Sequence, residues 1–432
     1  MTEELRRPEA YERYLEQLVV DAPGGDSFPD RQGAGLSAHE AVTARLAELE
    51  RELLDLSHTV HAHPELGFEE HHAASSVATL LDGLGIDVEV GVYSLETAFT
   101  TIAGEGRPRV AILAEYDALP GIGHGCGHNV ICAAGVGGFL AAAAHVGEVG
   151  GSVQLIGTPA EEGGSGKELI ARAGGFDEVD CAMMVHPAGS ASAACTYLGM
   201  RQVEVVFRGL EAHASAVPFM GKNALDACVA AYSMVAQLRQ HMLPDDRIHG
   251  VITDGGDKPN IIPDRSAAMY FVRSRYIDTL VELTERMDAI FEAAASATGT
   301  IAETNWDINP VALPVRNNMV LANRFALSQS RRGNPMPLRS PVPSGSTDMG
   351  NVSVRVPSIH PKVAVAPSTV PVHTAEFARY AGSPSGDEGV LNGAYGLAMT
   401  ALDYLADAEL RSDVQAEFEL AGGVADVVGL DR

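Results

Sequence analysis

A cysteine and a histidine stand two positions apart in the glycine-rich segment GIGHGCGHN, just after a short apolar run and two acidic residues. They are Cys126 and His128, and Asp117 precedes them. A thiolate and an imidazole are strong ligands for borderline-soft divalent ions, and the glycines let the backbone turn tightly around an ion. Asp117 could accept a hydrogen bond from the ligand imidazole and orient it. The segment therefore predicts part of a metal site.

Three later segments offer the remaining groups, each after a strand-like run. They are Glu161-Glu162 after SVQLIGTP, His186 after CAMMV, and His373 in PVHTAEF. Loops at the carboxyl ends of parallel strands meet at one edge of a sheet, so we expect these side chains near Cys126. Of two adjacent carboxylates, one can bind metal while the other stays free as a general base. Taken singly, each residue also fits a purely structural role.

A further histidine, His213 in GLEAHASAVP, is separated from these loops along the chain. It could reach a developing oxyanion only if its own module folds over the site, or if a partner subunit supplies it.

The order of apolar segments predicts an α/β protein. An amphipathic helix over residues 42–56 precedes strands and helices that alternate between residues 75 and 196, which is typical of a mainly parallel sheet. Residues 197–310 change to the order β-α-β-β-α-β, the split βαβ or ferredoxin-like arrangement. This module is inserted into the first domain, whose helices and strands resume over residues 316–405.

We therefore divide the chain into four parts. They are an N-terminal extension with a short possible helix (1–36), a discontinuous metal-binding domain (37–196 and 316–410), an inserted domain (197–315), and an acidic C-terminal tail with few signals of order (411–432).

Composition limits the partners and the compartment. The formal net charge is −27 and only four residues are lysines, which argues against nucleic acid and anionic membrane surfaces as partners. The sequence has no long apolar run and no signal-peptide pattern at its N-terminus. The five cysteines are scattered and odd in number, so a disulfide framework is not expected. We expect a cytoplasmic protein.

The motifs AEYDALPGIGHGCGHN, TPAEEGG, VHP, GLEAHAS, NIIPD and STDMGNVS, taken in this order, resemble those of the co-catalytic metallopeptidases and aminoacylases. The likeness covers about residues 40–405 and is strongest to the branch of the p-aminobenzoyl-glutamate hydrolases and β-alanyl-lysine-type dipeptidases. The resemblance implies a metallopeptidase domain with an inserted lid and dimerisation domain, two divalent metal ions (Zn or Mn, with Co possible), and a homodimer.

The resemblance also implies roles for single residues. Cys126 would bridge the two metals, and Glu161 would be the general base that moves a proton from water to the leaving amine. His213, acting across the dimer, and Asn260 would hold the substrate and its oxyanion. Arg273 is a candidate for binding a substrate carboxylate. The other metal ligands would be His128, Glu162, His186 and His373.

The implied activity is hydrolysis of an amide bond in a small N-acyl amino acid, an aminobenzoyl-glutamate-like conjugate or a dipeptide. Asn129 stands where the auxin-conjugate branch usually has Asp, which disfavours an auxin-type substrate. Two alternatives are a hydrolase of another amide or a carbamate on the same site, and a catalytically silent dimeric ligand-binding homologue. The complete set of metal-site residues favours an enzyme.

Overall fold

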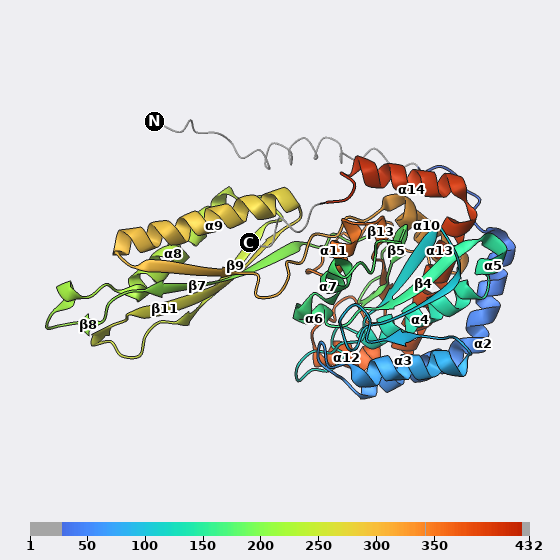
Figure 1. The fold of residues 1–432 in the computed structure, drawn as a ribbon, viewed down its shortest axis with the longest axis horizontal. Coiled ribbons are helices and arrows are strands. Elements are labelled where there is room, and N and C mark those ends of the chain that lie inside the picture. The colour runs from blue at the N-terminus through green and yellow to red at the C-terminus, as the bar shows by residue number, and fades with distance from the viewer. Residues whose placement is uncertain (1–27, 342, 426–432) are drawn as a thin grey trace. The chain divides into compact units, whose positions relative to one another are not determined.

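The computed structural model describes residues 28–341 and 343–425 and divides them into two compact units. The unit that carries the residues expected to bind metal, called the catalytic unit after that expectation, consists of residues 28–196, 315–341 and 343–425, and the inserted unit is Tyr197–Pro314. Each unit is described by itself below (Figure 1). The helix predicted near the N-terminus falls on residues 1–27, outside the described residues.

The catalytic unit is built on a six-stranded sheet with the order β1-β2-β4-β3-β5-β13. The contacts among β4, β3, β5 and β13 are parallel, whereas β2 pairs antiparallel with β1 and β4. The predicted α/β class with a largely parallel sheet is therefore confirmed. The strands are β1 (Glu89–Val90), β2 (Phe99–Glu105), β3 (Arg109–Ala114), β4 (Gly151–Gly157), β5 (Cys181–Met183) and β13 (Ser358–Ile359).

The central strands are buried on both faces, because their alternate residues enter two different apolar cores. On β3, Val110 and Ile112 belong to one core and Ala111 and Leu113 to the other. Successive side chains of a strand point to opposite faces, so continuous apolar runs are what a sheet covered on both sides requires. The polar residues that follow each strand then emerge at its end.

Three helices form much of the larger core: α2 (Gly35–Ala62), α4 (His128–Ala143) and α13 (Pro384–Ala406). Nearly every residue of α4 is buried, since α2, α13 and the sheet all pack against it. Gly137 permits this close approach: a Cβ there would lie 2.7 Å from Leu53 Cδ1 and 3.0 Å from Ala394 Cβ.

The remaining elements of the catalytic unit are shorter. They are α3 (His71–Gly83), α5 (Val146–Val149), α6 (Glu161–Gly164), α7 (Gly166–Arg172), α10 (Met319–Arg331), α11 (Met349–Ser353), α12 (Ala375–Ala381), α14 (Ala408–Leu420), and the paired strands β6 (His186–Ala188) and β14 (Lys362–Ala364).

Helix α14 corrects one expectation. We expected little order after residue 410, but residues 408–420 form a helix. Leu410, Val414 and Phe418 are buried at intervals of four residues, and Asp407 caps the helix by accepting hydrogen bonds from the amides of Glu409 and Leu410. The acidic surface residues masked an apolar stripe that is sufficient to hold the helix on the core.

The inserted unit contains a four-stranded antiparallel sheet with the order β12-β7-β11-β9 and two long helices. This topology is consistent with the expected βαββαβ module. Strand β9 lies at one edge of the sheet. The elements are β7 (Gly199–Arg208), β8 (Ala212–His213), η1 (Pro218–Met220), α8 (Ala224–Leu238), η2 (Arg239–His241), β9 (Arg247–Asp254), β10 (Ile261–Ile262), β11 (Arg265–Ser274), α9 (Ile277–Thr298) and β12 (Ile301–Trp306).

Two further observations concern the described residues as a whole. All five cysteines are free and buried. Across residues 28–341 and 343–425, every helix is too short or too polar to cross a bilayer.

The packing around α4 predicts that Gly137→Leu destabilises the catalytic unit. The added side chain must displace Leu53 and Ala394 in a filled core, and overpacking of this kind costs about 1–3 kcal/mol. Chemical denaturation should show a lower midpoint. Gly147→Leu is the matched control, because a Cβ at Gly147 meets nothing within 4 Å. Equal midpoints for the two variants would contradict this account of the core.

Candidate metal centre

The segment between β3 and α4 places Cys126 and His128 at the end of the parallel strands. Gly127 adopts the left-handed conformation with φ 78°, and a Cβ there would come within 2.6 Å of Pro187. The turn therefore requires glycine. It lets α4 begin at His128, so this imidazole is fixed by a long buried helix.

Asn129, the next residue of α4, has a structural role. Its side-chain amide donates hydrogen bonds to Ser57 Oγ at 2.9 Å and to the carbonyl of Ala381 at 3.0 Å. An aspartate here would turn a carboxylate toward a carbonyl oxygen, which has no proton to give. The amide thus ties the start of α4 to the chain around it.

Asp117 holds both His128 and Glu162. One carboxylate oxygen accepts the Nδ1 proton of His128 at 2.9 Å, and the other accepts the backbone amide of Glu162 at 2.8 Å. Burial alone would raise the pKa of Asp117, but the charge and hydrogen bond of His128 bring it below its ordinary value. With its proton on Nδ1, His128 presents Nε2 as a ligand atom, as metal-binding histidines do. This geometry supports the orienting role expected for Asp117.

The loop that carries Glu161 and Glu162 is bracketed by left-handed residues. Ala160 has φ 56° and Ser165 has φ 54°. The amide of Ala160 donates to the buried carboxylate of Glu70 at 2.8 Å, which stabilises this uncommon conformation. Both glutamates are thereby turned toward His128: Glu161 Oε2 and Glu162 Oε1 each lie 4.0 Å from its Nε2.

Two more histidines complete the cluster. His186 donates from Nδ1 to the carbonyl of Pro187 at 2.7 Å, which leaves Nε2 directed at Cys126 Sγ at 3.4 Å. His373, itself left-handed with φ 62°, places Nε2 3.2 Å from Glu162 Oε1. The structure thus brings together all six residues expected at the sheet edge.

Cys126 belongs to two overlapping groups of ligand atoms. It lies with His128 and His186 in one group and with Glu162 and His373 in another, and the atoms within each group are within 4.8 Å of one another. His128, Glu161 and Glu162 are also shared between two such groups, and the bridging role that the resemblance implies for Cys126 stays a prediction.

The two adjacent glutamates differ electrostatically. Burial, followed by the nearby charges of Glu115 and Glu162, raises the pKa of Glu161 well above its ordinary value. Burial would also raise the pKa of Glu162, but His373 and His128 lower it overall. Carboxylates whose pKa values are pushed apart are suited to different tasks, one as a proton carrier and one as an ionised ligand.

The buried imidazole and thiol groups of the cluster have the properties of metal ligands. Burial lowers the pKa of His186 to about 3, so its imidazole is neutral. Burial also raises the pKa of the Cys126 thiol, so a thiolate there needs a cation beside it. His128 Nε2 is buried and makes no hydrogen bond to the described residues.

Sequence reasoning missed three residues beside this cluster. Glu115 Oε2 lies 3.5 Å from His128 Nε2, and Lys167 donates from Nζ to Glu115 and, at 2.6 Å, to Asp348 Oδ1. Glu115 had a visible signal, because it follows β3 two positions before Asp117. Asp348 lies in the motif STDMGNVS, to which we gave no role, and nothing in the sequence marked Lys167.

Divalent ions fit this cluster. Five carboxylates converge on it, Lys167 pairs with two of them, and buried carboxylates of like charge are unfavourable unless cations compensate them. Thiolate, imidazole and carboxylate together suit Zn²⁺ and similar ions. The carboxylates are Glu115, Asp117, Glu161, Glu162 and Asp348.

The other expected site residues lie in the inserted unit. His213 on β8 pairs with Ile261, and the amide of Ala214 donates to the carbonyl of Asn260 at 3.0 Å, so His213 and Asn260 are neighbours. Arg273 is near the far end of β11, where its guanidinium lies over the ring of Phe271. The structure therefore groups His213 with Asn260 but not with Arg273, whose role stays a prediction.

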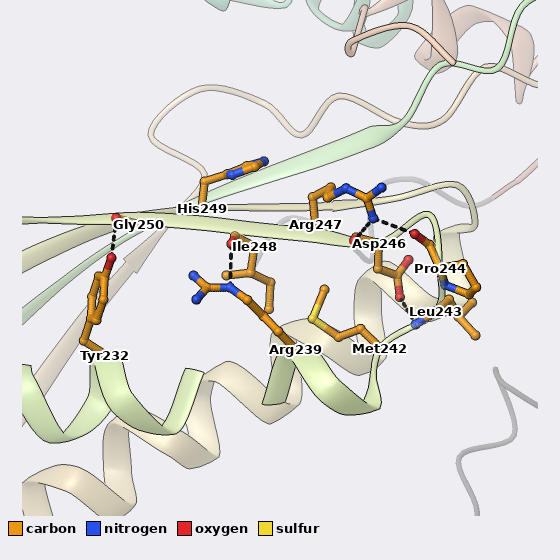
Figure 2. Close-up of a pocket in the computed structure, with 10 residues that line it drawn as sticks. All are labelled: Tyr232, Arg239, Met242, Leu243, Pro244, Asp246, Arg247, Ile248, His249 and Gly250. Carbon is orange, nitrogen blue, oxygen red and sulfur yellow. Dashed lines mark hydrogen bonds between the residues drawn. The ribbon is translucent and has the colours of Figure 1, made fainter. Parts of the chain in front are cut away.

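The inserted unit also has a surface cavity of about 590 Å³ beside β9. Figure 2 shows that its two arginines already bond to main-chain carbonyls: Arg239 to Ile248, and Arg247 to Pro244 and Asp246. The cavity includes none of the expected site residues.

The contacts of Asp117 predict that Asp117→Asn weakens metal binding. The change removes the charge that fixes the His128 tautomer, and losses at such supporting carboxylates are typically about 10–100-fold in metal affinity. Competition against a chromogenic chelator measures this. Asp387→Asn is the control, since Asp387 pairs with the exposed His58. Unchanged affinity in Asp117→Asn would refute the orienting role.

Comparison with known proteins identifies relatives that cover most of this chain. The mouse protein Xaa-Arg dipeptidase is 36% identical over 392 residues, which cover 87% of this chain and 90% of the relative. One of the subunits of the p-aminobenzoyl-glutamate hydrolase of Escherichia coli (strain K12) is 29% identical, covering 84% and 91%. A dinuclear metal-binding peptidase of family M20 from Bacillus subtilis has the same fold, with a TM-score of 0.61 at 21% identity, covering 80% and 98%.

The resemblance predicted from the motifs is thus confirmed. Residues 111–376 match the peptidase family M20/M25/M40, and this stretch contains all six residues of the cluster. The chain belongs to the peptidase family M20/M25/M40.

Proposed function

We propose that this chain is a metal-dependent amidohydrolase that cleaves an amide bond in a small N-acyl amino acid, an aminobenzoyl-glutamate-like conjugate or a dipeptide. The observation that carries the proposal is the pairing of a complete ligand cluster with Glu161, a protonatable carboxylate beside it. The names of the mouse and Escherichia coli relatives support a dipeptide or an aminobenzoyl-glutamate conjugate as the substrate class.

The residues that would hold two divalent ions are Cys126 as the shared ligand, with His128, Glu162, His186 and His373 around it. Zn or Mn, and also Co, suit this mixture of a thiolate, imidazoles and carboxylates. Ions bound there would polarise the scissile carbonyl and lower the pKa of water.

Glu161 moves the proton in this proposal. Its raised pKa lets it hold a proton taken from the attacking water and return it to the departing amine. The left-handed turn at Ala160 and the bond from its amide to Glu70 keep the carboxylate aimed at the ligand cluster.

His213 is proposed to stabilise the oxyanion. Its Nδ1 accepts the amide of Ala216 at 3.2 Å, so the ring proton is on Nε2 and is available to a developing negative charge. Asn260, its neighbour, and Arg273 are proposed to bind the rest of the substrate.

We also propose a homodimer that forms through the inserted unit, with His213 acting across it. Strand β9 is an edge strand, and its Val251 and Ile252 are exposed, at 61% and 40%. An unpaired apolar edge of this kind is a ready surface for a second copy. The free cysteines favour a reducing compartment, so we place the protein in the cytoplasm.

The function is tested by hydrolysis assays on metal-stripped protein to which Zn²⁺, Mn²⁺ or Co²⁺ is returned. The panel contains aminobenzoyl-glutamate, N-acyl amino acids, and dipeptides with arginine or lysine at the C-terminus. We expect turnover of at least one class that depends on added metal. A protein that takes up no divalent ion, or that hydrolyses none of the panel when loaded, would defeat the proposal.

Glu161→Gln should retain metal and lose turnover. The amide keeps the shape of the side chain but cannot accept a proton, and a positioned base contributes about 10²–10⁴-fold to the rate. Turnover and metal content are measured on the same sample. Glu148→Gln is the control, because Glu148 is an exposed residue of α5. A rate within about tenfold of the unchanged protein would exclude the general-base role.

A mixing experiment tests whether His213 acts across the dimer. His213→Ala and Glu161→Gln should each be nearly inactive. After subunit exchange, a mixed dimer has one site with an intact Glu161 and an intact His213 from the partner, so activity should return. A mixture as inactive as its components, although mixed dimers form by mass spectrometry, would show that His213 does not act in trans.

A further inference from the structure

Lys167 is an unusual lysine for this chain. The chain has only four lysines and a net charge of −27, and the side chain of Lys167 is fully buried. The cost of removing an ammonium group from water is large unless it is fully paired. Nearby carboxylates raise the pKa of Lys167 despite its burial, so it is charged.

The partners of Lys167 are two of the three carboxylates of Glu115, Glu161 and Asp348, which together could hold a cation and are called the cage below. Its Nζ donates to Glu115 Oε1 and to Asp348 Oδ1, and its backbone amide donates to Asp348 Oδ2 at 2.9 Å. Glu115, Glu161 and Asp348 each offer an oxygen within 4.8 Å of the others, which is a spacing that could hold a cation. The ammonium group of Lys167 already contacts two of these carboxylates, Glu115 and Asp348.

The cage adjoins the metal cluster through two of its members. Glu115 bonds Lys167 with one oxygen, and its other oxygen lies 3.5 Å from His128 Nε2. Glu161 Oε2 lies 4.0 Å from the same nitrogen. Without a resident cation, an oxygen-rich cage so close to the cluster would attract a further divalent ion, and Glu161 would become one of its ligands.

We propose that the Lys167 ammonium is a built-in cation that occupies the cage of Glu115, Glu161 and Asp348, excludes a third metal ion, and so keeps Glu161 unligated. The inference rests on the proposed function in one respect, namely that Glu161 is the base. A purely structural lysine would hold Glu115 and Asp348 in place but would have no effect on how many ions the protein binds.

The test is the number of ions bound per chain in Lys167→Met, which keeps the length of the side chain and removes its charge. Protein is stripped with chelator, loaded with Mn²⁺, freed of unbound ion by gel filtration and measured by elemental analysis. We expect one more Mn²⁺ per chain than in the unchanged protein. Lys222→Met, which alters an exposed lysine of the inserted unit, should bind the unchanged number.

A double variant shows where the additional ion binds. Lys167→Met combined with Asp348→Asn removes one carboxylate from the cage, and the additional ion should be lost. A folded Lys167→Met that binds the same number of ions as the unchanged protein overturns the proposal, as does an additional ion that persists in the double variant.

Crystals of the unchanged protein loaded with Mn²⁺ provide a test that does not require the variant to fold. Anomalous scattering should place ions at the Cys126 cluster and none among Glu115, Glu161 and Asp348. An ion in the cage, or one ligated by Glu161, would overturn the proposal. Failure of the proposed function is a separate result, because it is seen as absent turnover in loaded protein while the ion count remains readable.

Discussion

Repulsion among carboxylates at one edge of the sheet is the constraint on which the site depends. Glu115 and Asp117 leave β3, Glu161 and Glu162 follow β4, and Asp348 precedes α11. Ionised carboxylates this close cannot all stay buried without positive charge beside them. Lys167 supplies part of that charge within the chain, and metal ions at the cluster around Cys126 are proposed to supply the rest.

The backbone holds these groups against their repulsion. Asp117 connects His128 to the amide of Glu162, so the proposed ligand on α4 and the proposed ligand after β4 are held by the same carboxylate. Glu70 performs a related function for the turn at Ala160. Asp117 and Glu70 each accept hydrogen bonds from a backbone amide, and Asp117 also accepts one from the ring of His128. These hydrogen bonds stabilise the negative charge of the carboxylate and at the same time fix the position of the donor.

Much of this could be predicted from the sequence, because the rule that functional loops follow parallel strands needs only local patterns. The apolar runs that precede Asp117, Glu162 and His186 were visible without knowing the tertiary contacts. Lys167 was not, since its role depends on Asp348, which lies 181 positions further along the chain, directly before α11. Helix α14 was missed for a different reason: its three buried apolar residues are separated by polar and acidic residues, so the segment has no apolar run that predicts a helix.

The burial of α4 has a consequence for how such proteins diversify. A helix enclosed by α2, α13 and the sheet has no free face, and Gly137 leaves no room for a larger side chain. His128, the proposed ligand at its first turn, is therefore held by a tightly packed helix, whereas the inserted unit is a separate compact unit with its own sheet. A substitution inside the inserted unit therefore leaves the packing around α4 unaltered, and the sequences of the two units can vary separately.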